Sequence, residues 1–216
     1  MAKKKETKLK KKPLSVGRPF KKDALDVREA LIEAGIQLLN TNSIEEISLR
    51  NVAKIAGVSH VASYHHFENK QALFSAIAEI GFQKYFETYQ TELKRTDQDF
   101  KGRFKALGWT YFQFIMTHKQ FARIMFGGIG IDLNSNPALS AVSKRTYRQL
   151  HDIIRLGQNL GYLEKDKTRE KTLASWAMIH GITMLFLEGR LKIKNDISEM
   201  ENFIQTVTEY AYIGMK

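Results

Sequence analysis

Apolar residues recur at helical spacing along most of the chain, and the alternating runs typical of strands are missing. One stripe, Val27, Leu31, Ala34 and Leu38, predicts a first helix that ends near residues 40–42. Similar stripes predict further helices near 99–118, 120–127, 138–160, 168–190 and 197–213, separated by linkers at 96–99, 127–136 and 161–167. We therefore expect an all-α fold.

Two short helices are predicted between residues 48 and 66. Ser48 can cap the first helix, and Gly57 ends it because glycine tolerates the positive φ of a tight turn. Ser59 can cap the second helix, which reaches about His66. Four residues of the first short helix are expected to face inward: Leu49, Val52, Ala53 and Ala56. Two short helices joined by such a turn form a helix-turn-helix.

A longer helix is predicted to follow, beginning at Glu68 or Asn69. Its expected inward-facing residues are Leu73, Phe74, Ile77 and Ile80. We expect three segments in the chain: a basic arm (1–22) that is disordered when free, an N-terminal three-helix helix-turn-helix domain (23–74), and a C-terminal helical domain (75–216).

The positive charge of the chain is concentrated at its start. The formal net charge of the whole chain is +11. Residues 1–22 hold ten Lys or Arg against one Glu, whereas residues 23–74 hold four Lys or Arg against seven acidic residues. The basic arm, rather than the helix-turn-helix domain, is therefore the segment best suited to attract the phosphates of a nucleic acid.

Composition excludes several kinds of function. The chain has no cysteine, which rules out disulfides and thiolate chemistry and fits a reducing cytoplasm. Its longest apolar run, Trp176–Leu187, is shorter than the ~20 residues that cross a bilayer. No apolar segment follows the N-terminal lysines, so no signal peptide is predicted. We expect a cytoplasmic protein without a membrane partner, a metal or a cofactor.

The residues around the two short helices resemble the DNA-binding domain of the TetR family. The matching elements are Ala56–Ser59 (AGVS), Tyr64, His66 and Phe67 (YxHF), and Lys70 and Leu73 of the next helix. The resemblance extends over about residues 25–75 without a gap. One departure is Ser63, where family members commonly carry an apolar residue, and we expect it to loosen the packing of the second short helix.

The resemblance implies that this domain binds a double-stranded DNA operator. Arg50 can read guanine because its guanidinium matches the O6 and N7 atoms, and Lys70 at a helix start can hold phosphate. The expected DNA contacts are Arg18, Ser48, Arg50, Ser59, His60, Val61, Ala62, Tyr64, His65, His66 and Lys70. For Tyr64 the alternative is a core position. A zinc site at His65 and His66 is disfavoured, since adjacent helical residues point ~100° apart.

Arg18 lies between Gly17 and Pro19 in the basic arm. An extended Arg-Pro segment suits the narrow minor groove of DNA, so we expect the arm to add to DNA affinity. The alternative is a solvated tail that only aids solubility.

Aromatic residues are concentrated early in the C-terminal domain, where residues 82–126 hold 12 of the 23 aromatics in the chain. Such a set can form a helical core or the wall of an apolar ligand cavity. The candidate ligand contacts are Phe86, Phe112, Met116, Met125, Trp176 and His180. A histidine in an apolar helix, such as His180, is more often a hydrogen-bonded core residue than a ligand contact.

The segment Trp176–Gly181 resembles the WHG C-terminal domain of some TetR-type regulators, and Asn136–Leu139 and Gly161–Leu163 also look like that domain. The helix around it is apolar on nearly all sides, so it needs cover from its own subunit and from a partner. The last helix has its own stripe, Met200, Ile204, Val207 and Ala211. Family resemblance implies that these last two helices form a four-helix interface in a homodimer. The monomeric alternative is a last helix that closes its own core.

These observations predict a TetR-type regulator that binds a pseudo-palindromic operator as a dimer. A small, mostly apolar effector is expected to release it, through different affinities for two states of the dimer. Repression is the family default, and activation is the alternative. Two other classes stay open. An architectural DNA-binding protein led by the basic arm would bind without sequence preference. An enzyme would need a catalytic set, and no Ser-His-acid or paired-carboxylate constellation stands out.

Overall fold

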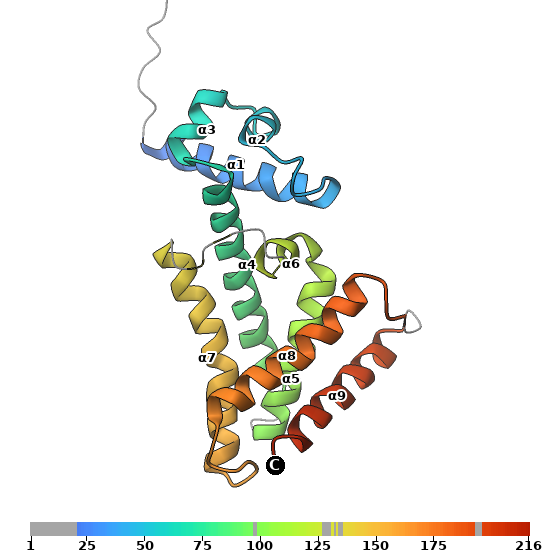
Figure 1. The fold of residues 1–216 in the computed structure, drawn as a ribbon. Coiled ribbons are helices and arrows are strands. Elements are labelled where there is room, and N and C mark those ends of the chain that lie inside the picture. Colours follow the sequence, from blue (N-terminus) through green and yellow to red (C-terminus); the bar gives the residue numbers. More distant parts are fainter. Residues whose placement is uncertain (1–20, 97–98, 127–130, 132, 134–135, 193–195) are drawn as a thin grey trace, which may run out of the picture.

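The computed structural model describes residues 21–216 except 97–98, 127–130, 132, 134–135 and 193–195. Within these residues the chain forms nine helices and no strand (Figure 1), so the all-α prediction is confirmed. The helices are α1 (Lys21–Thr41), α2 (Leu49–Ile55), α3 (His60–His66), α4 (Lys70–Leu93), α5 (Phe100–Thr117), α6 (Lys119–Phe126), α7 (Pro137–Asn159), α8 (Thr168–Leu187) and α9 (Ile197–Ile213). Arg18 and the rest of the basic arm up to residue 20 lie outside the described residues.

Helices α1, α2 and α3 pack together at one end of the molecule (Figure 1). Helix α1 supplies much of their shared core, because Leu31, Ala34 and Leu39 are buried on it. Val27 and Leu38, the other members of the predicted stripe, are half-buried. The three helices therefore form the unit that the spacing of apolar residues predicts.

Helix α4 connects this unit to the rest of the molecule (Figure 1). Asn69 caps it by accepting the backbone N–H of Ala72 at 2.8 Å. Because α1, α5, α6 and α7 all contact this helix, Phe74 and Ile77 are buried in it. Ile80, by contrast, is exposed, although the pattern predicts it to face inward. The predicted domain boundary after residue 74 falls inside this continuous helix.

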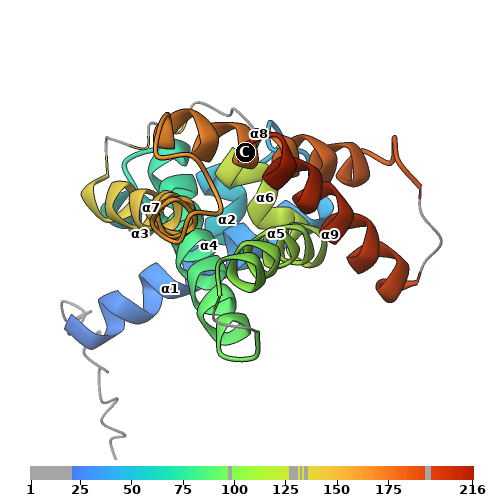
Figure 2. The same ribbon diagram turned by 90° about the horizontal axis from the view of Figure 1, so that it is seen from below.

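Helix α5 lies at the centre of the C-terminal part, in contact with α4, α6, α7, α8 and α9. Between Phe104 and Ile115 it buries every residue except Lys105 and Gln113. Helices α8 and α9 lie side by side over α5 (Figures 1 and 2). Of the helices that the structure describes, none combines the length and apolar character needed to cross a bilayer.

Side chains at the helix starts explain where several helices of the C-terminal part begin. Asp99, Asn136 and Asp196 each accept a backbone N–H from the first turn of α5, α7 and α9. Pro137 then occupies the first position of α7, where its missing N–H costs nothing. Helix α8 has no such cap, and Lys167 before it adopts a left-handed backbone with φ +46°.

Candidate nucleic-acid interface and internal cavity

Two serines fix the starts of both helices of the helix-turn-helix. The hydroxyl oxygen of Ser48 accepts the backbone N–H of Asn51 at 3.2 Å and so begins α2. Ser59 begins α3 in the same way, through the N–H of Ala62 at 3.1 Å. Each hydroxyl keeps its own O–H, which remains able to donate to a phosphate.

The turn between α2 and α3 depends on Gly57. Its φ of +69° lies in the left-handed region that glycine adopts without strain. The N–H of Val58 then returns to the carbonyl of Ala53 at 3.0 Å, and the Val58 side chain packs against the core. The predicted helix-turn-helix is therefore confirmed, with its turn at the predicted glycine.

The outer face of α3 is exposed along its length. Val61 and Tyr64 are 67% and 51% exposed, and His60 and His65 are exposed as well. The rings of His60 and Tyr64 meet edge to face with their centroids 4.9 Å apart. Two further candidate contacts, Ala62 and His66, are half-buried. This face offers an aliphatic group, a phenol and imidazoles, a set that can contact both base edges and phosphates.

Ser63 occupies the inner face of α3 and is fully buried. Its hydroxyl donates to the carbonyl of His60 at 2.7 Å, so the buried polar group has a partner. Next to it, buried Phe67 ends α3, and the guanidinium of Arg28 lies 5.5 Å from its ring centre. The sequence predicts looser packing at Ser63, whereas the structure buries this residue completely with its hydrogen bond made.

The two basic candidates of this domain differ in their surroundings. Arg50 is exposed and has no hydrogen bond or ion pair with the described residues. Lys70 is half-buried: its Nζ donates to the carbonyl of Ile44 at 3.0 Å and lies 5.7 Å from the ring centre of Phe74. Two hydrogens of the Lys70 ammonium remain for a phosphate, because an ammonium has three donors.

Side chains also hold the loop that precedes α2. The carboxylate of Glu46 accepts the N–H of Ser43 at 2.9 Å, and this hydrogen bond lowers the pKa of Glu46. The side-chain amide of Asn51 donates to the carbonyl of Glu46 at 3.3 Å. Together with the Lys70 contact to Ile44, these bonds hold the loop that leads into α2, the helix that begins after Ser48 and carries Arg50.

The described residues around His65 and His66 form no metal site. His65 is exposed whereas its neighbour His66 is half-buried, so the two rings have different surroundings. Across the whole described part of the chain, no group of three or more His, Asp or Glu side chains could hold a metal ion.

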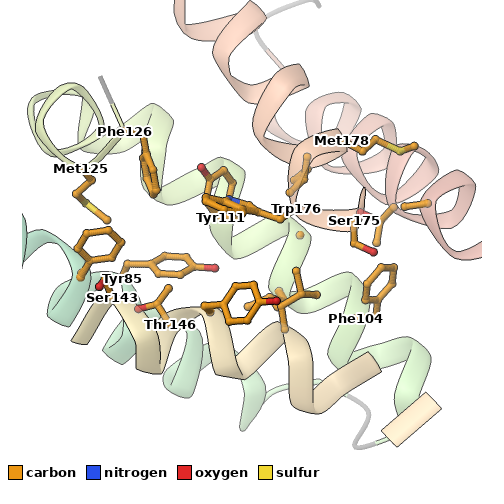
Figure 3. Close-up of a pocket in the computed structure, with 18 of the residues that line it drawn as sticks. Tyr85, Phe104, Tyr111, Met125, Phe126, Ser143, Thr146, Ser175, Trp176 and Met178 are labelled. Carbon is orange, nitrogen blue, oxygen red and sulfur yellow. The ribbon is translucent and has the colours of Figure 1, made fainter. Parts of the chain in front are cut away.

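A cavity of about 320 Å³ lies inside the C-terminal part, between α4, α5, α6, α7, α8 and α9. Its walls are mainly apolar and rich in aromatic side chains (Figure 3), which are Phe82, Tyr85, Phe104, Tyr111, Phe126, Tyr147 and Trp176. Among the described residues that line it, only Lys144 is charged, and that side chain is exposed. The volume is at the lower end of the ~300–1,000 Å³ typical of ligand pockets. The cavity therefore suits a small apolar molecule.

Two of the six candidate ligand contacts, Met125 and Trp176, line this cavity. Phe112 and Met116 are not among its lining residues and belong to a smaller apolar cluster between α5, α8 and α9. Phe86 is also absent from the lining, and its ring packs beneath a basic residue of α7. Because α5 is buried on almost every side, its helical spacing does not reveal which face lines the cavity.

His180, the sixth candidate, lies behind the wall and contacts Tyr111. Its Nδ1 is 2.7 Å from the Tyr111 hydroxyl, and its ring centre is 5.4 Å from that of Phe126. Burial lowers the pKa of His180 and raises the pKa of Tyr111, so both groups are uncharged near neutral pH. His180 thus holds the Tyr111 side chain in place.

Several polar residues of the cavity wall, among them Tyr85, Ser143 and Thr146, are absent from the sequence-based candidates. Tyr85 belongs to the aromatic segment 82–126, but nothing in the sequence distinguishes it from its neighbours. Ser143 and Thr146 lie on α7, whose many polar residues suggest a solvent-facing helix. Only the packing of α7 against α4 and α5 brings these hydroxyls to an internal surface.

A side chain of α6 joins the cavity wall to the helix-turn-helix unit. The Nη1 of Arg123 donates to the carbonyls of Leu39 and Asn42, each at 3.1 Å. These acceptors lie at the C-terminal end of α1, where backbone carbonyls lack partners within the helix. Met125 and Phe126 of the same short helix line the cavity. A shift of α6 caused by a ligand would therefore reach α1 directly.

Small and apolar residues form an uncovered stripe along α8. Its exposed members are Ala174, Ala177, Met178, Gly181 and Leu185, which share one face of the helix. The stripe predicted on α9 faces the chain's own core instead, since Ile204 and Ala211 are buried. On α9 the exposed large apolar side chains are Ile197, Tyr210 and Ile213.

Two family models match the chain. Residues 31–77 match the model described as bacterial regulatory proteins of the tetR family. Residues 104–207 match the tetracyclin repressor-like C-terminal domain, a range that includes the Trp176–Gly181 segment. The first range holds α2 and α3, and the second holds most of the cavity wall.

Individual relatives agree with the family models. The chain is 33% identical to the class C tetracycline repressor of Escherichia coli over 100 residues, which are 46% of this chain and 44% of that protein. The match thus spans less than half of that relative's length. The chain is also 24% identical to the nucleoid occlusion factor SlmA of Marinobacter nauticus, over 76% of this chain and 82% of that protein.

Solved structures share the fold across almost the whole chain. A protein of unknown function from Rhodococcus superposes with a TM-score of 0.74 at 22% identity, covering 95% of this chain and 99% of that one. The TetR family regulator PfmR of Thermus thermophilus gives a TM-score of 0.64 at 18% identity, covering 86% and 98%. With its helix-turn-helix at α2 and α3 and its matching C-terminal domain, the chain belongs to the TetR family of DNA-binding transcriptional regulators.

Proposed function

We propose that the chain is a TetR-type repressor that binds a pseudo-palindromic operator as a homodimer and is released by a small, mostly apolar effector. The observation that carries the proposal is the exposed outer face of α3, where Val61 and Tyr64 are 67% and 51% exposed. The site of action is the cytoplasm, where bacterial operators lie.

In this proposal α3 lies in the major groove of DNA. Base edges are contacted by Arg50 and by the α3 residues His60, Val61, Ala62 and His65. Phosphates are held by Ser48, Ser59, Tyr64, His66 and Lys70, with Arg18 of the arm in the minor groove. The exposure of Arg50 and the free donors of Ser48 and Lys70 support these assignments.

Affinity for DNA depends on the basic arm as well as on α3. Residues 23–74 hold more acidic than basic side chains, so this domain alone gains little from the phosphate field of DNA. The ten Lys or Arg of residues 1–22 supply the missing attraction. Sequence reading and general DNA affinity are thus divided between neighbouring segments.

Dimerisation is proposed to occur through α8 and α9. The stripe Ala174–Leu185 supports this, because small residues allow two helices to approach closely and its apolar members gain from being covered. A two-fold dimer would present two copies of α3 to major grooves one helical turn apart, ~34–36 Å.

The effector is proposed to bind in the aromatic cavity. Release of DNA then requires that the effector bind one state of the dimer more tightly than the other. Contacts from Met125 and Phe126 in the cavity through Arg123 to the end of α1 support this route.

Selection of bound sequences from random DNA, using the full chain, tests the proposal. We expect a palindromic consensus, and loss of about 1–3 kcal/mol of binding free energy for Arg50→Ala on that sequence. Arg50→Lys is the matched control: it keeps the charge but loses the fork, so it should also lose base preference at the contacted position.

The second candidate is an architectural DNA-binding protein. The concentration of charge in residues 1–22 favours it, since such an arm binds any DNA. The same selection separates the two functions, because an architectural protein would enrich no consensus and would bind equally well after Arg50→Ala.

A further inference from the structure

The cavity offers no charge to a bound molecule. Its only charged lining residue within the described chain, Lys144, is exposed at the surface of α7. An ion buried without a partner pays a large desolvation cost. A molecule that enters the aromatic interior of this cavity is therefore favoured when it is neutral.

Most hydroxyls of the cavity wall already donate to another atom of the protein. Ser143 and Thr146 donate to carbonyls of their own helix at 3.2 and 3.0 Å. Ser175 and Thr208 do the same at 2.8 Å each, and the Tyr111 hydroxyl lies 2.7 Å from His180 Nδ1. The hydroxyls of these residues already have hydrogen-bond partners in the protein, so they gain little from a ligand.

Tyr85 is the exception among the buried residues that contribute a hydroxyl to the cavity wall. The residue is 4% exposed, yet its hydroxyl has no hydrogen-bond partner among the described residues. The rings of Tyr111 and Phe114 hold the Tyr85 ring, with centroids 5.8 and 5.4 Å away. Figure 3 shows its hydroxyl directed toward the middle of the cavity. Tyr147, the other lining tyrosine without such a bond, is only half-buried.

We infer that the effector is a neutral, largely aromatic molecule with one hydrogen-bond acceptor, such as a ketone oxygen, and that Tyr85 is the residue that recognises this acceptor. That the bound molecule acts as an effector rests on the proposed function. That the cavity binds such a molecule does not. The Tyr85 hydroxyl faces the cavity and has no acceptor in the described protein. An acceptor placed opposite it therefore gains a hydrogen bond that a hydrocarbon cannot make.

The protonation of Tyr85 fits this donor role. Burial raises the pKa of Tyr85 well above its ordinary value, and nearby Tyr111 and Tyr89 raise it further. The phenol therefore keeps its hydrogen throughout the physiological range. A ligand anion would meet no compensating cation at this depth of the cavity.

Three probes of similar shape test the inference: benzophenone, diphenylmethane and 4-benzoylbenzoate. The first two differ only by a carbonyl in place of a methylene group, and the third adds a carboxylate. Dissociation constants are measured by calorimetry without DNA, for the wild-type chain and for Tyr85→Phe. Tyr89→Phe is the matched control, because Tyr89 is buried on the same helix but does not line the cavity.

Wild-type protein should bind benzophenone more tightly than diphenylmethane. This preference should fall by about 3- to 10-fold in Tyr85→Phe, as expected for one hydrogen bond, and should persist in Tyr89→Phe. The carboxylate should bind at least about tenfold more weakly than benzophenone. An equal preference in wild type and Tyr85→Phe, tightest binding of 4-benzoylbenzoate, or no binding of benzophenone would overturn the inference.

Ligand binding and DNA release are measured separately, so the two proposals can fail independently. If benzophenone binds with the expected dependence on Tyr85 but leaves DNA binding unchanged, the effector role fails while the recognition by Tyr85 stands. The comparison of benzophenone with diphenylmethane in wild-type protein needs no variant. If wild type does not prefer benzophenone, the inference is overturned even when Tyr85→Phe folds poorly.

Discussion

The guanidinium of Arg123 lies 3.1 Å from the backbone carbonyl of Leu39, although 84 residues separate them in the chain. A second bond from the same nitrogen, to the carbonyl of Asn42, completes a cap on the end of α1. The positive charge is also well placed there, because the C-terminal end of a helix carries partial negative charge. This contact ties the helix-turn-helix unit to the helix that forms part of the cavity wall.

Replacement of Arg123 by glutamine should therefore loosen the end of α1. We expect the free energy of unfolding to fall by about 1–3 kcal/mol, since two carbonyls lose a charged donor. Amide hydrogen exchange should also speed up in the last turn of α1. Urea denaturation and exchange measured by mass spectrometry check both effects.

Lys119→Gln is the matched control for this prediction. Lys119 begins the same helix and is exposed, and its ammonium makes no hydrogen bond or ion pair with the described residues of α1. Its replacement should therefore change neither quantity. Equal effects of the two substitutions would mean that Arg123 does not hold α1.

Removal of residues 1–19 should weaken operator binding and flatten its dependence on salt. The deleted segment holds eight of the ten basic residues that precede residue 23. The slope of log affinity against log salt should become less steep by about 0.9 for each DNA phosphate that the shortened chain no longer neutralises. Anisotropy titrations over a range of salt concentrations measure it, and an unchanged slope would show that the arm is only a solvated tail.

Substitution of Gly181 by glutamate should separate the dimer without harming the fold of one chain. A Cβ at Gly181 would have no atom within 4 Å inside the chain, and glutamate favours a helix over glycine by about 0.5–1 kcal/mol. Across a close α8 interface, however, two glutamates would face each other. Sedimentation should then show monomers with folded helices.

Arg169→Glu controls for the added negative charge. Arg169 is exposed in the first turn of α8, away from the stripe, and its replacement should leave the oligomeric state unchanged. If the Gly181→Glu variant is still a dimer, the dimer interface does not lie on this face of α8.

Substitution of Ser63 by leucine should destabilise the helix-turn-helix unit. The residue is fully buried, and extra methyl groups in a filled site cost about 1–3 kcal/mol. Ser63→Ala should cost no more than about 1 kcal/mol, because it removes only one hydrogen bond. If urea denaturation shows leucine to be stabilising, the site has spare room and the looser packing predicted from the sequence is correct.

The helix-turn-helix could be predicted closely because its determinants are local. Ser48, Ser59 and Asn69 cap the helices that follow them, and Gly57 supplies the left-handed turn between two of them. Each of these signals acts within a few residues of chain. The surroundings of Lys70 were not predictable, because its bond to Ile44 joins segments 26 residues apart.

The cavity could be predicted only in outline. A cluster of aromatics between residues 82 and 126 indicated either a core or a ligand site, and both are present. The residues that line the cavity depend on how α4, α5, α7 and α8 pack. Trp176 and Phe112 were therefore equal candidates in the sequence, yet Trp176 lines the cavity and Phe112 lies in the smaller apolar cluster. The sequence does not distinguish Tyr85 or Arg123 from its neighbours. The structure does, because Arg123 donates to the end of α1 and the Tyr85 hydroxyl has no partner among the described residues.

The spacing of the two halves of the operator tests the proposed mode of DNA binding most directly. A dimer that places two copies of α3 in successive major grooves requires half-sites one helical turn apart, ~10 base pairs. Inserting about five base pairs turns one half-site to the opposite side of the duplex. We predict that this insertion reduces affinity for the selected sequence to that for random DNA. Unchanged affinity after the insertion would contradict binding by a two-fold dimer.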